Sequence, residues 1–100
     1  MDPAGLPALV EAIRHLHGAE ATHVESVPVR EVFDGKVVWE GEVQVFDLAG
    51  HPTATRVYAW SHATTGMKRR FVAVLHVPPV DTPAAAVRAA IGAEYRAAQN

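Results

Sequence analysis

Apolar residues follow a helical spacing near the start of the chain. Over residues 6–17, LPALVEAIRHLH, leucine, valine and isoleucine recur every three or four positions and so fall along one stripe of a helix. Pro7 fits the first helical turn, where a missing N–H breaks no hydrogen bond, and Gly18 is typical of the position after a helix end. The pattern predicts a helix over residues 6–17.

A second helical pattern lies at the other end of the chain. Val87, Ile91 and Tyr95 recur at four-residue spacing within an alanine-rich segment. Thr82 is a good N-cap, because its hydroxyl can accept a hydrogen bond from the first turn, and the proline after it suits the first helical position. We predict a helix from Pro83 to about Gln99.

Between these helices the spacing changes to the alternation of β-strands. Residues 36–48, KVVWEGEVQVFDL, alternate between an apolar and a mostly polar side. Asp34-Gly35 before them is a strong hairpin-turn signal and predicts a preceding strand over residues 27–33. Pro28 lacks the N–H that a central strand needs, so this strand is expected at a sheet edge. Residues 19–26 have no clean period.

A second hairpin is predicted further along. A strand over residues 69–77 contains the run FVAVLHV, the most continuously apolar in the chain, which is typical of a strand buried on both faces. Its partner is a strand over residues 53–62. A tight turn at Thr65-Gly66 would place Trp60 opposite Phe71.

This order of elements predicts an α+β fold. Short strand connections suit a four-stranded antiparallel meander, with the N- and C-terminal helices packed on one face in two layers (α-β-β-β-β-α). One hundred residues fit a single domain over residues 1–100. The apolar content is largely 18 alanines and 15 valines, so the core is thin and a homodimer is a reasonable expectation.

Composition narrows the function classes. A net charge of −2 argues against a general nucleic-acid binder, since neutralising phosphates requires an excess of lysine and arginine. The absence of cysteine excludes disulfides, thiol catalysis and iron–sulfur clusters. No basic leader is visible, and no apolar run approaches the roughly 20 residues of a membrane span. We expect a soluble, cytoplasmic protein without a membrane partner, and its alanine-, valine- and arginine-rich usage suggests a bacterial one.

The six histidines have no metal-ligand spacing. His15 and His17 are two positions apart on a predicted helix and therefore point to different sides. Neither of the two serines lies in a nucleophile elbow, and the sequence has no phosphate-binding or dinucleotide-binding glycine pattern. We expect neither a metal nor a cofactor.

Two carboxylates offer an enzymatic alternative. Glu40 and Glu42 share the polar side of one strand and are close enough to perturb each other's pKa. A pair of acids can perform acid–base chemistry, so one hypothesis is a small enzyme using Glu40 and Glu42 with His51 or His62 in a pocket. Alternating glutamates also keep an exposed strand soluble, and a flat surface here would count against the enzyme.

Aromatic and basic residues share one side of the second hairpin in the expected register. If the aliphatic side faces the helices, this side faces outward and can stack bases, hold a flat or cationic ligand, or dock a subunit. The leading hypothesis is therefore a small non-enzymatic binding or interaction module, working as a homodimer with an unidentified ligand or protein partner. The opposite assignment makes these aromatics the core. The candidate face consists of Arg56, Tyr58, Trp60, His62, Arg69 and Phe71.

Four short motifs occupy the middle of the chain: Trp39-Glu40-Gly41, Phe46-Asp47-Leu48, Gly50-His51-Pro52 and Tyr58-Ala59-Trp60-Ser61. Through these motifs, slightly more than half of the chain resembles short, stand-alone bacterial proteins of unknown function, which implies no activity. The helix–sheet–helix order also resembles that of double-stranded-RNA-binding domains, which implies RNA binding as a further hypothesis. Those domains have a lysine cluster at the start of the last helix, where this chain reads TPAAA at 82–86.

Overall fold

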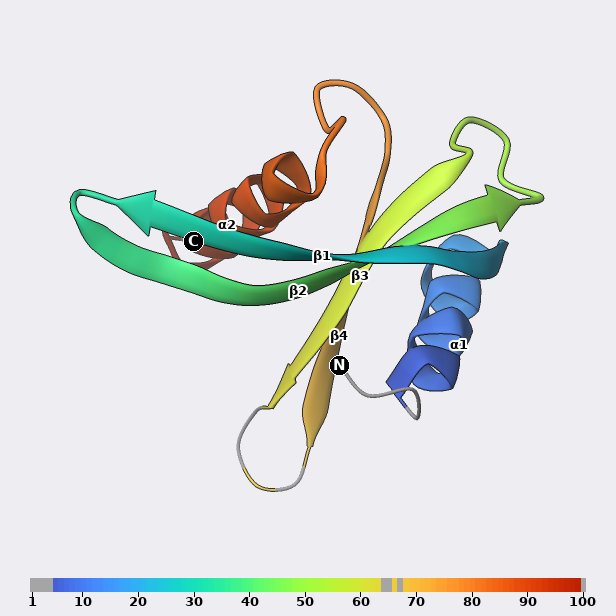
Figure 1. Ribbon diagram of the computed structural model, residues 1–100, viewed down its shortest axis with the longest axis horizontal. Helices are drawn as coiled ribbons and strands as arrows, with labels where there is room; N and C mark the ends of the chain where they lie inside the picture. Colours follow the sequence, from blue (N-terminus) through green and yellow to red (C-terminus); the bar gives the residue numbers. More distant parts are fainter. Residues whose placement is uncertain (1–4, 64–65, 67, 100) are drawn as a thin grey trace.

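The computed structural model describes residues 5–63, 66 and 68–99 (Figure 1). The strands form one open antiparallel sheet in the order β1-β2-β3-β4, between an N-terminal and a C-terminal helix, which confirms the predicted α-β-β-β-β-α order of an α+β fold. The elements are α1 (Gly5–His17), β1 (Glu20–Phe33), β2 (Lys36–Ala49), β3 (Arg56–Ala63), β4 (Arg69–Leu75) and α2 (Pro83–Gln99).

Local signals correctly placed the end of α1, the start of α2 and the first hairpin turn, whereas β1 begins earlier than predicted, at Glu20, and β4 ends earlier, at Leu75. Gly18 has a φ of 66° and donates its N–H to the Arg14 carbonyl at 2.8 Å, which ends α1 where predicted. The Thr82 hydroxyl accepts the Ala85 N–H at 3.0 Å and begins α2. At the first hairpin, Asp34 and Gly35 both have positive φ, as a tight turn between β1 and β2 requires.

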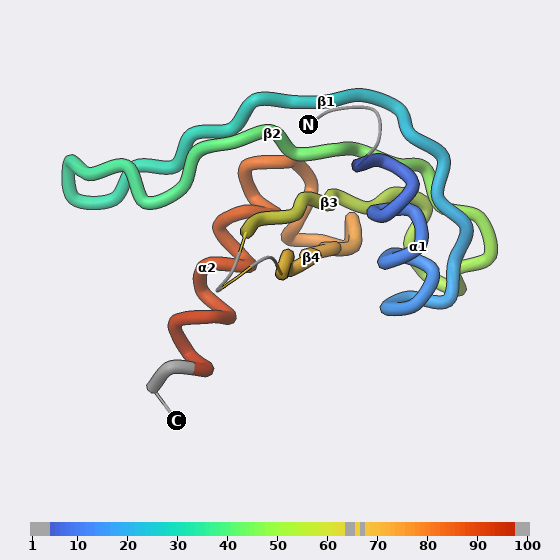
Figure 2. Tube along the Cα trace, turned by 90° about the horizontal axis from the view of Figure 1, so that it is seen from below, coloured from blue at the N-terminus to red at the C-terminus, as the bar shows by residue number. Residues whose placement is uncertain are grey.

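The two helices pack on opposite faces of the sheet. Leu9 and Ile13 of α1 pack with Val57 of β3, whereas Val87 of α2 packs with Tyr58, the next residue along β3. Neighbouring residues of a strand point to opposite faces, so β3 lies between two separate small cores. Figure 2 shows the helices standing apart, with β3 and β4 between them. The prediction that both helices share one face in two layers is wrong, because both sides of the second hairpin are apolar.

Strand β4 lies at an edge of the sheet. Its apolar run was expected to mark a strand buried on both faces, but residues 71–75 are only half-buried. The run is apolar on both sides because the core under α1 takes in Phe71, Ala73 and Leu75, while the core under α2 takes in the alternate valines. The prediction of a fully buried strand is therefore wrong.

The register of the second hairpin differs from the expected one by one residue. Trp60 pairs with Val72 rather than with Phe71, so the pairing is centred on Gly66, which has a φ of 75°. Thr65, the other residue of the expected turn, lies outside the described residues. A shift of one residue moves every side chain of β4 to the other face, so Phe71 lies on the face that α1 covers.

A bulge at Val24 explains why residues 19–26 show no period. His23 pairs with Phe46 and Glu25 with Val45, so Val24 has no partner in β2. Odd-numbered residues before the bulge face α1, and those after it face α2. The Gln44 side-chain oxygen lies 2.9 Å from His23 Nε2 and accepts a hydrogen bond from Ser26 Oγ at 2.5 Å, which links both sides of the bulge to β2.

The β1–β2 hairpin extends well beyond the other strands. The pairing of β2 with β3 begins only at Gln44. The eight residues before it, from Lys36 to Val43, lie beside β1 alone. At about 3.3 Å per residue, this two-stranded arm, residues 27–43, is roughly 26 Å long. Figure 1 shows it projecting past α2. Two strands alone are marginally stable, so the arm depends on what covers it.

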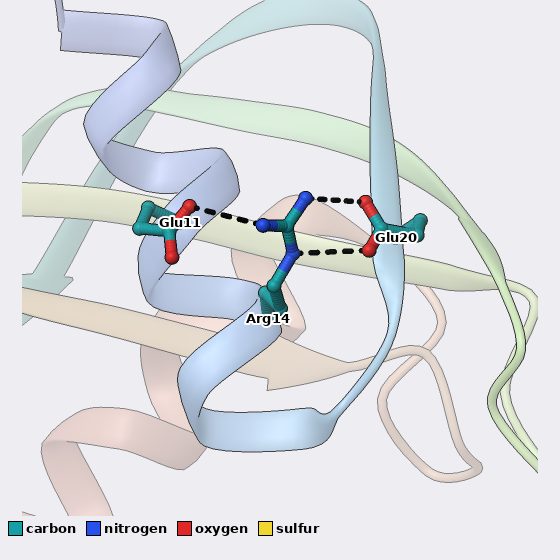
Figure 3. A network of polar contacts seen from close by, with 3 residues as sticks. All are labelled: Glu11, Arg14 and Glu20. Atoms are coloured by element: carbon teal, nitrogen blue, oxygen red, sulfur yellow. Dashed lines mark hydrogen bonds and ion pairs between the residues drawn. The ribbon is translucent and has the colours of Figure 1, made fainter.

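A charged network fastens the end of α1 to the start of β1 (Figure 3). The Arg14 guanidinium donates to both carboxylate oxygens of Glu20, from Nε at 3.0 Å and Nη2 at 2.8 Å, and its Nη1 lies 3.4 Å from Glu11. The hydrogen bonds from Arg14 lower the pKa of Glu20, and the same bonds raise the pKa of Arg14. This contact fixes the angle at which the chain leaves the helix.

Candidate functional site

The structure does not bring the six predicted face residues together. Arg56, Tyr58, Trp60 and His62 lie on the face that α2 covers, whereas Phe71 lies on the face that α1 covers, and Arg69 shares its parity. Tyr58 and Trp60 are only 2% and 4% exposed. The prediction of one outward aromatic and basic face is therefore wrong, because α2 buries its aromatic centre.

The charged members of that set make local contacts. Arg56 Nη2 lies 3.4 Å from Asp47 on the neighbouring strand, and both Arg69 Nε and Nη2 donate to the Ser61 hydroxyl, at 3.2 and 3.1 Å. His62 stays exposed near the end of β3. These three residues lie at separate places along the rim of the sheet.

A pocket of about 300 Å³ remains where α2 crosses the aromatic side of the sheet. Its wall contains Trp39 and Trp60, whose rings meet edge to face with centroids 5.5 Å apart. His62 and Glu94 add polar groups, and Glu94 also lies 3.4 Å from Arg70. The pocket is lined by Trp39, Trp60, His62, Val72, Val87, Ala90, Ile91 and Glu94.

The glutamate pair does not share a pocket with His62, because neither Glu40 nor Glu42 lines the tryptophan pocket that contains it. Glu40 and Glu42 lie exposed on the arm, and Glu40 is 3.6 Å from Arg30 on β1. His51 instead accepts the N–H groups of Thr53 and Ala54 in the β2–β3 loop. Among residues 5–63, 66 and 68–99, no three histidine or acidic side chains are grouped so that they could hold a metal ion.

A groove runs along the open edge of β4. It has a volume of about 620 Å³ and lies between β4, the last turn of α1 and the alanine-rich side of α2. His17 Nε2 lies 3.0 Å from the Ala73 carbonyl oxygen, which it can cap as a donor. A strand added to this edge would have to displace that contact, so His17 protects the edge from pairing.

The most exposed apolar surface lies where the arm meets the second half of α2. A cleft of about 630 Å³ opens there, and Phe33, at 74% exposed, and Tyr95, at 67%, stand beside it. Five of the exposed large apolar side chains recorded for the described residues belong to the arm tip, residues 32–38, or to α2: Val32, Phe33, Val37, Val38 and Tyr95. The cleft is lined by Glu31, Val32, Phe33, Val38, Arg88, Ile91, Gly92, Tyr95 and Arg96.

Charged side chains lie at both ends of this cleft. Arg88 Nη1 bridges from α2 to both Glu31 oxygens, at 3.2 and 3.3 Å, and the Glu31 side chain is only 15% exposed. The pair ties the arm to α2 at the inner end of the cleft. Arg96, at the outer end, has no ion pair with any residue that the structure describes.

This cleft was not predicted from the sequence, although the sequence contains a pattern that indicates it. Val32-Phe33 and Val37-Val38 flank the Asp-Gly turn, so the arm tip is apolar on both parities where only one side can face the molecule's own core. Tyr95 and Gly92 belong to a helix that runs past the sheet. An apolar hairpin end combined with a glycine inside a helix is the pattern that would have indicated the surface.

The fold was also compared with known proteins. Neither the family models, nor the curated proteins, nor the solved structures contain a match to this chain. No helix in the described ranges is both long and apolar enough to span a membrane.

Proposed function

We propose that this protein is a small non-enzymatic interaction module that works as a homodimer. The observation behind this proposal is the exposed apolar surface of the arm tip and α2. Four of these exposed side chains, Val32, Phe33, Val38 and Tyr95, line one cleft, and large exposed apolar patches typically mark protein–protein contacts. A cytoplasmic bacterial location, expected from the sequence, is part of the same proposal.

The thin core supports the dimer on energetic grounds. Two cores are divided by one sheet, and in α2 only Ala86 and Val87 are fully buried among the residues whose burial is described. The second half of α2 and the arm tip therefore gain little from their own chain. Burial against another subunit would stabilise both, by the hydrophobic effect at about 25 cal/mol per Å².

Sedimentation velocity at increasing protein concentration tests the proposal. We expect a shift from monomer to dimer between about 1 and about 100 µM, together with a urea midpoint that rises with concentration, because association stabilises the folded state. A chain that stays monomeric over this range, with a constant midpoint, would contradict the homodimer.

The tryptophan pocket favours a second candidate function, the binding of a small flat or cationic ligand. Aromatic rings attract organic cations, and the carboxylate of Glu94 adds negative charge. Titration with choline, followed by tryptophan fluorescence, tests this idea. Saturable quenching that Glu94→Gln weakens is expected if the pocket binds cations, and a linear response identical in both proteins would contradict it.

Enzymatic and RNA-binding functions have weaker support. Neither Glu40 nor Glu42 lines the pocket that contains His62, and His51 Nδ1 accepts the N–H groups of its own loop, which leaves acid–base chemistry with little support. The start of α2 lacks the basic cluster that the RNA-binding resemblance requires. A non-specific RNA-binding assay at low and high salt would revive the second idea only if affinity falls steeply with salt.

A further inference from the structure

We propose that the cleft between the arm and α2 binds the arm tip of a second copy, with Phe33 of one copy seated over Gly92 of the other. The inference rests on the proposed homodimer and names its interface. The exchange is reciprocal, because each chain has both the projecting tip and the receiving cleft. A two-fold arrangement of this kind repeats every contact twice and closes without leaving a free site.

Gly92 is the first argument for the interface. Glycine inside a helix is destabilising relative to alanine, and close packing over the missing Cβ is one reason for a glycine at such a position. Gly41 has such a reason within the chain, since an added Cβ would meet the Trp39 ring at 3.2 Å. At Gly92 the nearest atom would be the mobile end of Arg96, at 3.4 Å. Apart from the end of Arg96, the space over Gly92 is therefore open within its own chain, so another surface can approach the helix backbone there.

The arm tip supplies a surface that fits. Phe33 is 74% exposed and precedes the tight Asp34-Gly35 turn at the end of a two-stranded arm, where it lines the cleft of its own chain and leaves most of its ring open to a second copy. The cleft contains Ile91 and Tyr95 on either side of Gly92 in sequence, which gives an apolar hollow with a glycine in its wall. An aromatic ring in a pocket is a typical anchor of a protein interface.

Charge complementarity favours a second copy over an unrelated partner. Asp34 follows Phe33 directly, and Arg96 lies one helical turn beyond Gly92. Neither side chain has an ion pair with another residue in the described ranges. With Phe33 seated over Gly92, Asp34 of one copy reaches Arg96 of the other. One chain thus provides an unpaired acid on its tip and an unpaired base beside its cleft.

Gly92→Ala gives the sharpest test, because it separates folding from association. Alanine favours the helix, so at high dilution the thermal midpoint of the variant should rise by a few degrees. The added methyl group fills the position of the incoming ring, so the dimer dissociation constant should rise by roughly 100-fold. A variant that dimerises as tightly as the wild type would overturn the proposal.

Two further variants guard against a misleading result. Phe33→Ser removes an exposed ring and should abolish the dimer while preserving the circular dichroism spectrum and cooperative unfolding. Leu16→Ser is the matched control, since Leu16 is 54% exposed on α1, away from the cleft, and its loss should leave the dimer unchanged. A dimer lost in the control and kept in Phe33→Ser would overturn the assignment.

A double-mutant cycle tests the register. Asp34→Asn and Arg96→Gln should each weaken the dimer by about tenfold, because each ion pair occurs twice, and the double variant should be no weaker than either single one. Additive losses would overturn the proposed contact. A wild type that is monomeric throughout contradicts the homodimer itself, whereas a dimer insensitive to changes at Phe33, Gly92 and the ion pair contradicts only this interface.

Discussion

Trp39 of β2 and Trp60 of β3 meet edge to face beneath α2, with ring centroids 5.5 Å apart and planes inclined at 67°. Trp60 is 4% exposed and packs in the same cluster as Val87 of α2. Aromatic pairs in this geometry add about 0.5–1.5 kcal/mol beyond the area they bury. The contact makes Trp60 part of the core under α2 rather than part of an outward sheet face.

Trp60→Ala should therefore destabilise the protein severely. Removing a buried tryptophan leaves a cavity and typically costs about 3–5 kcal/mol, a large part of the stability of a small domain. Urea unfolding followed by circular dichroism measures the loss. Leu16→Ala, at an exposed position, should change the free energy of unfolding by less than about 0.5 kcal/mol. If the Trp60→Ala protein is as stable as the wild type, Trp60 does not belong to the core.

Tyr58→Phe should remove a pH dependence at high pH. The Tyr58 hydroxyl lies 2.5 Å from His76 Nδ1, and burial raises the pKa of Tyr58 above 10.0, with Asp81 adding to this and Arg56 opposing it. The folded state holds the proton more tightly, so its stabilising effect is complete below pH 10 and is lost as the pH rises through the folded pKa. Wild-type stability should fall in that range.

In Tyr58→Phe that fall should be smaller, while stability at neutral pH drops by about 1 kcal/mol for the lost hydrogen bond. Chemical denaturation of both proteins at pH 7 and at several values above 10.0 measures both effects. Parallel curves for the two proteins would show that the hydroxyl of Tyr58 is not the titrating group.

Glu20 should titrate at a lower pH than a free glutamate. Its hydrogen bonds from Arg14 lower its pKa below 4.5, so the stabilisation is present above that value and is lost as the pH falls through the folded pKa. Carbon-detected NMR titration of the carboxyl group measures the shift directly. In Arg14→Gln the pKa of Glu20 should move upward, and an unchanged titration curve would mean that the ion pair does not persist in solution.

His51 should stabilise the β2–β3 loop as a hydrogen-bond acceptor. Its Nδ1 accepts the Thr53 N–H at 3.2 Å and the Ala54 N–H at 3.0 Å. His51→Ala should cost about 1 kcal/mol, because two backbone donors lose their partner. His51→Asn keeps an acceptor at the same distance along the chain and should retain most of the stability. Equal losses in both variants would assign the effect to the ring contact with His17.

The parts of the fold that short segments determine could be predicted from the sequence. Gly18, Thr82 and the Asp34-Gly35 turn act through hydrogen bonds and dihedral angles within a few residues, so their effect does not depend on the rest of the chain. The order and types of the elements follow from these boundaries and the spacing of the apolar residues between them.

The faces of the sheet could not be predicted in the same way. The pairing of β3 with β4 is centred on Gly66 rather than between Thr65 and Gly66, which moves the β4 side chains to the opposite faces from those expected. The bulge at Val24 likewise exchanges the faces of the β1 residues that follow it. In both strands, a shift of a single residue decides which face of the sheet all the following side chains lie on. The predicted face failed for two reasons: Phe71 and Trp60 lie on opposite faces of the sheet, and α2 buries the face that holds Tyr58 and Trp60.

Because of the bulge at Val24, the fold should tolerate the loss of one residue from β1 at this position. Removing one residue from a strand normally turns all later side chains inside out. Here the pairs on either side, His23 with Phe46 and Glu25 with Val45, already alternate as an uninterrupted ladder would. A relative without Val24 would keep both cores and have only a straighter β1. Length differences at this position would thus alter the local bend of β1 while leaving the architecture unchanged.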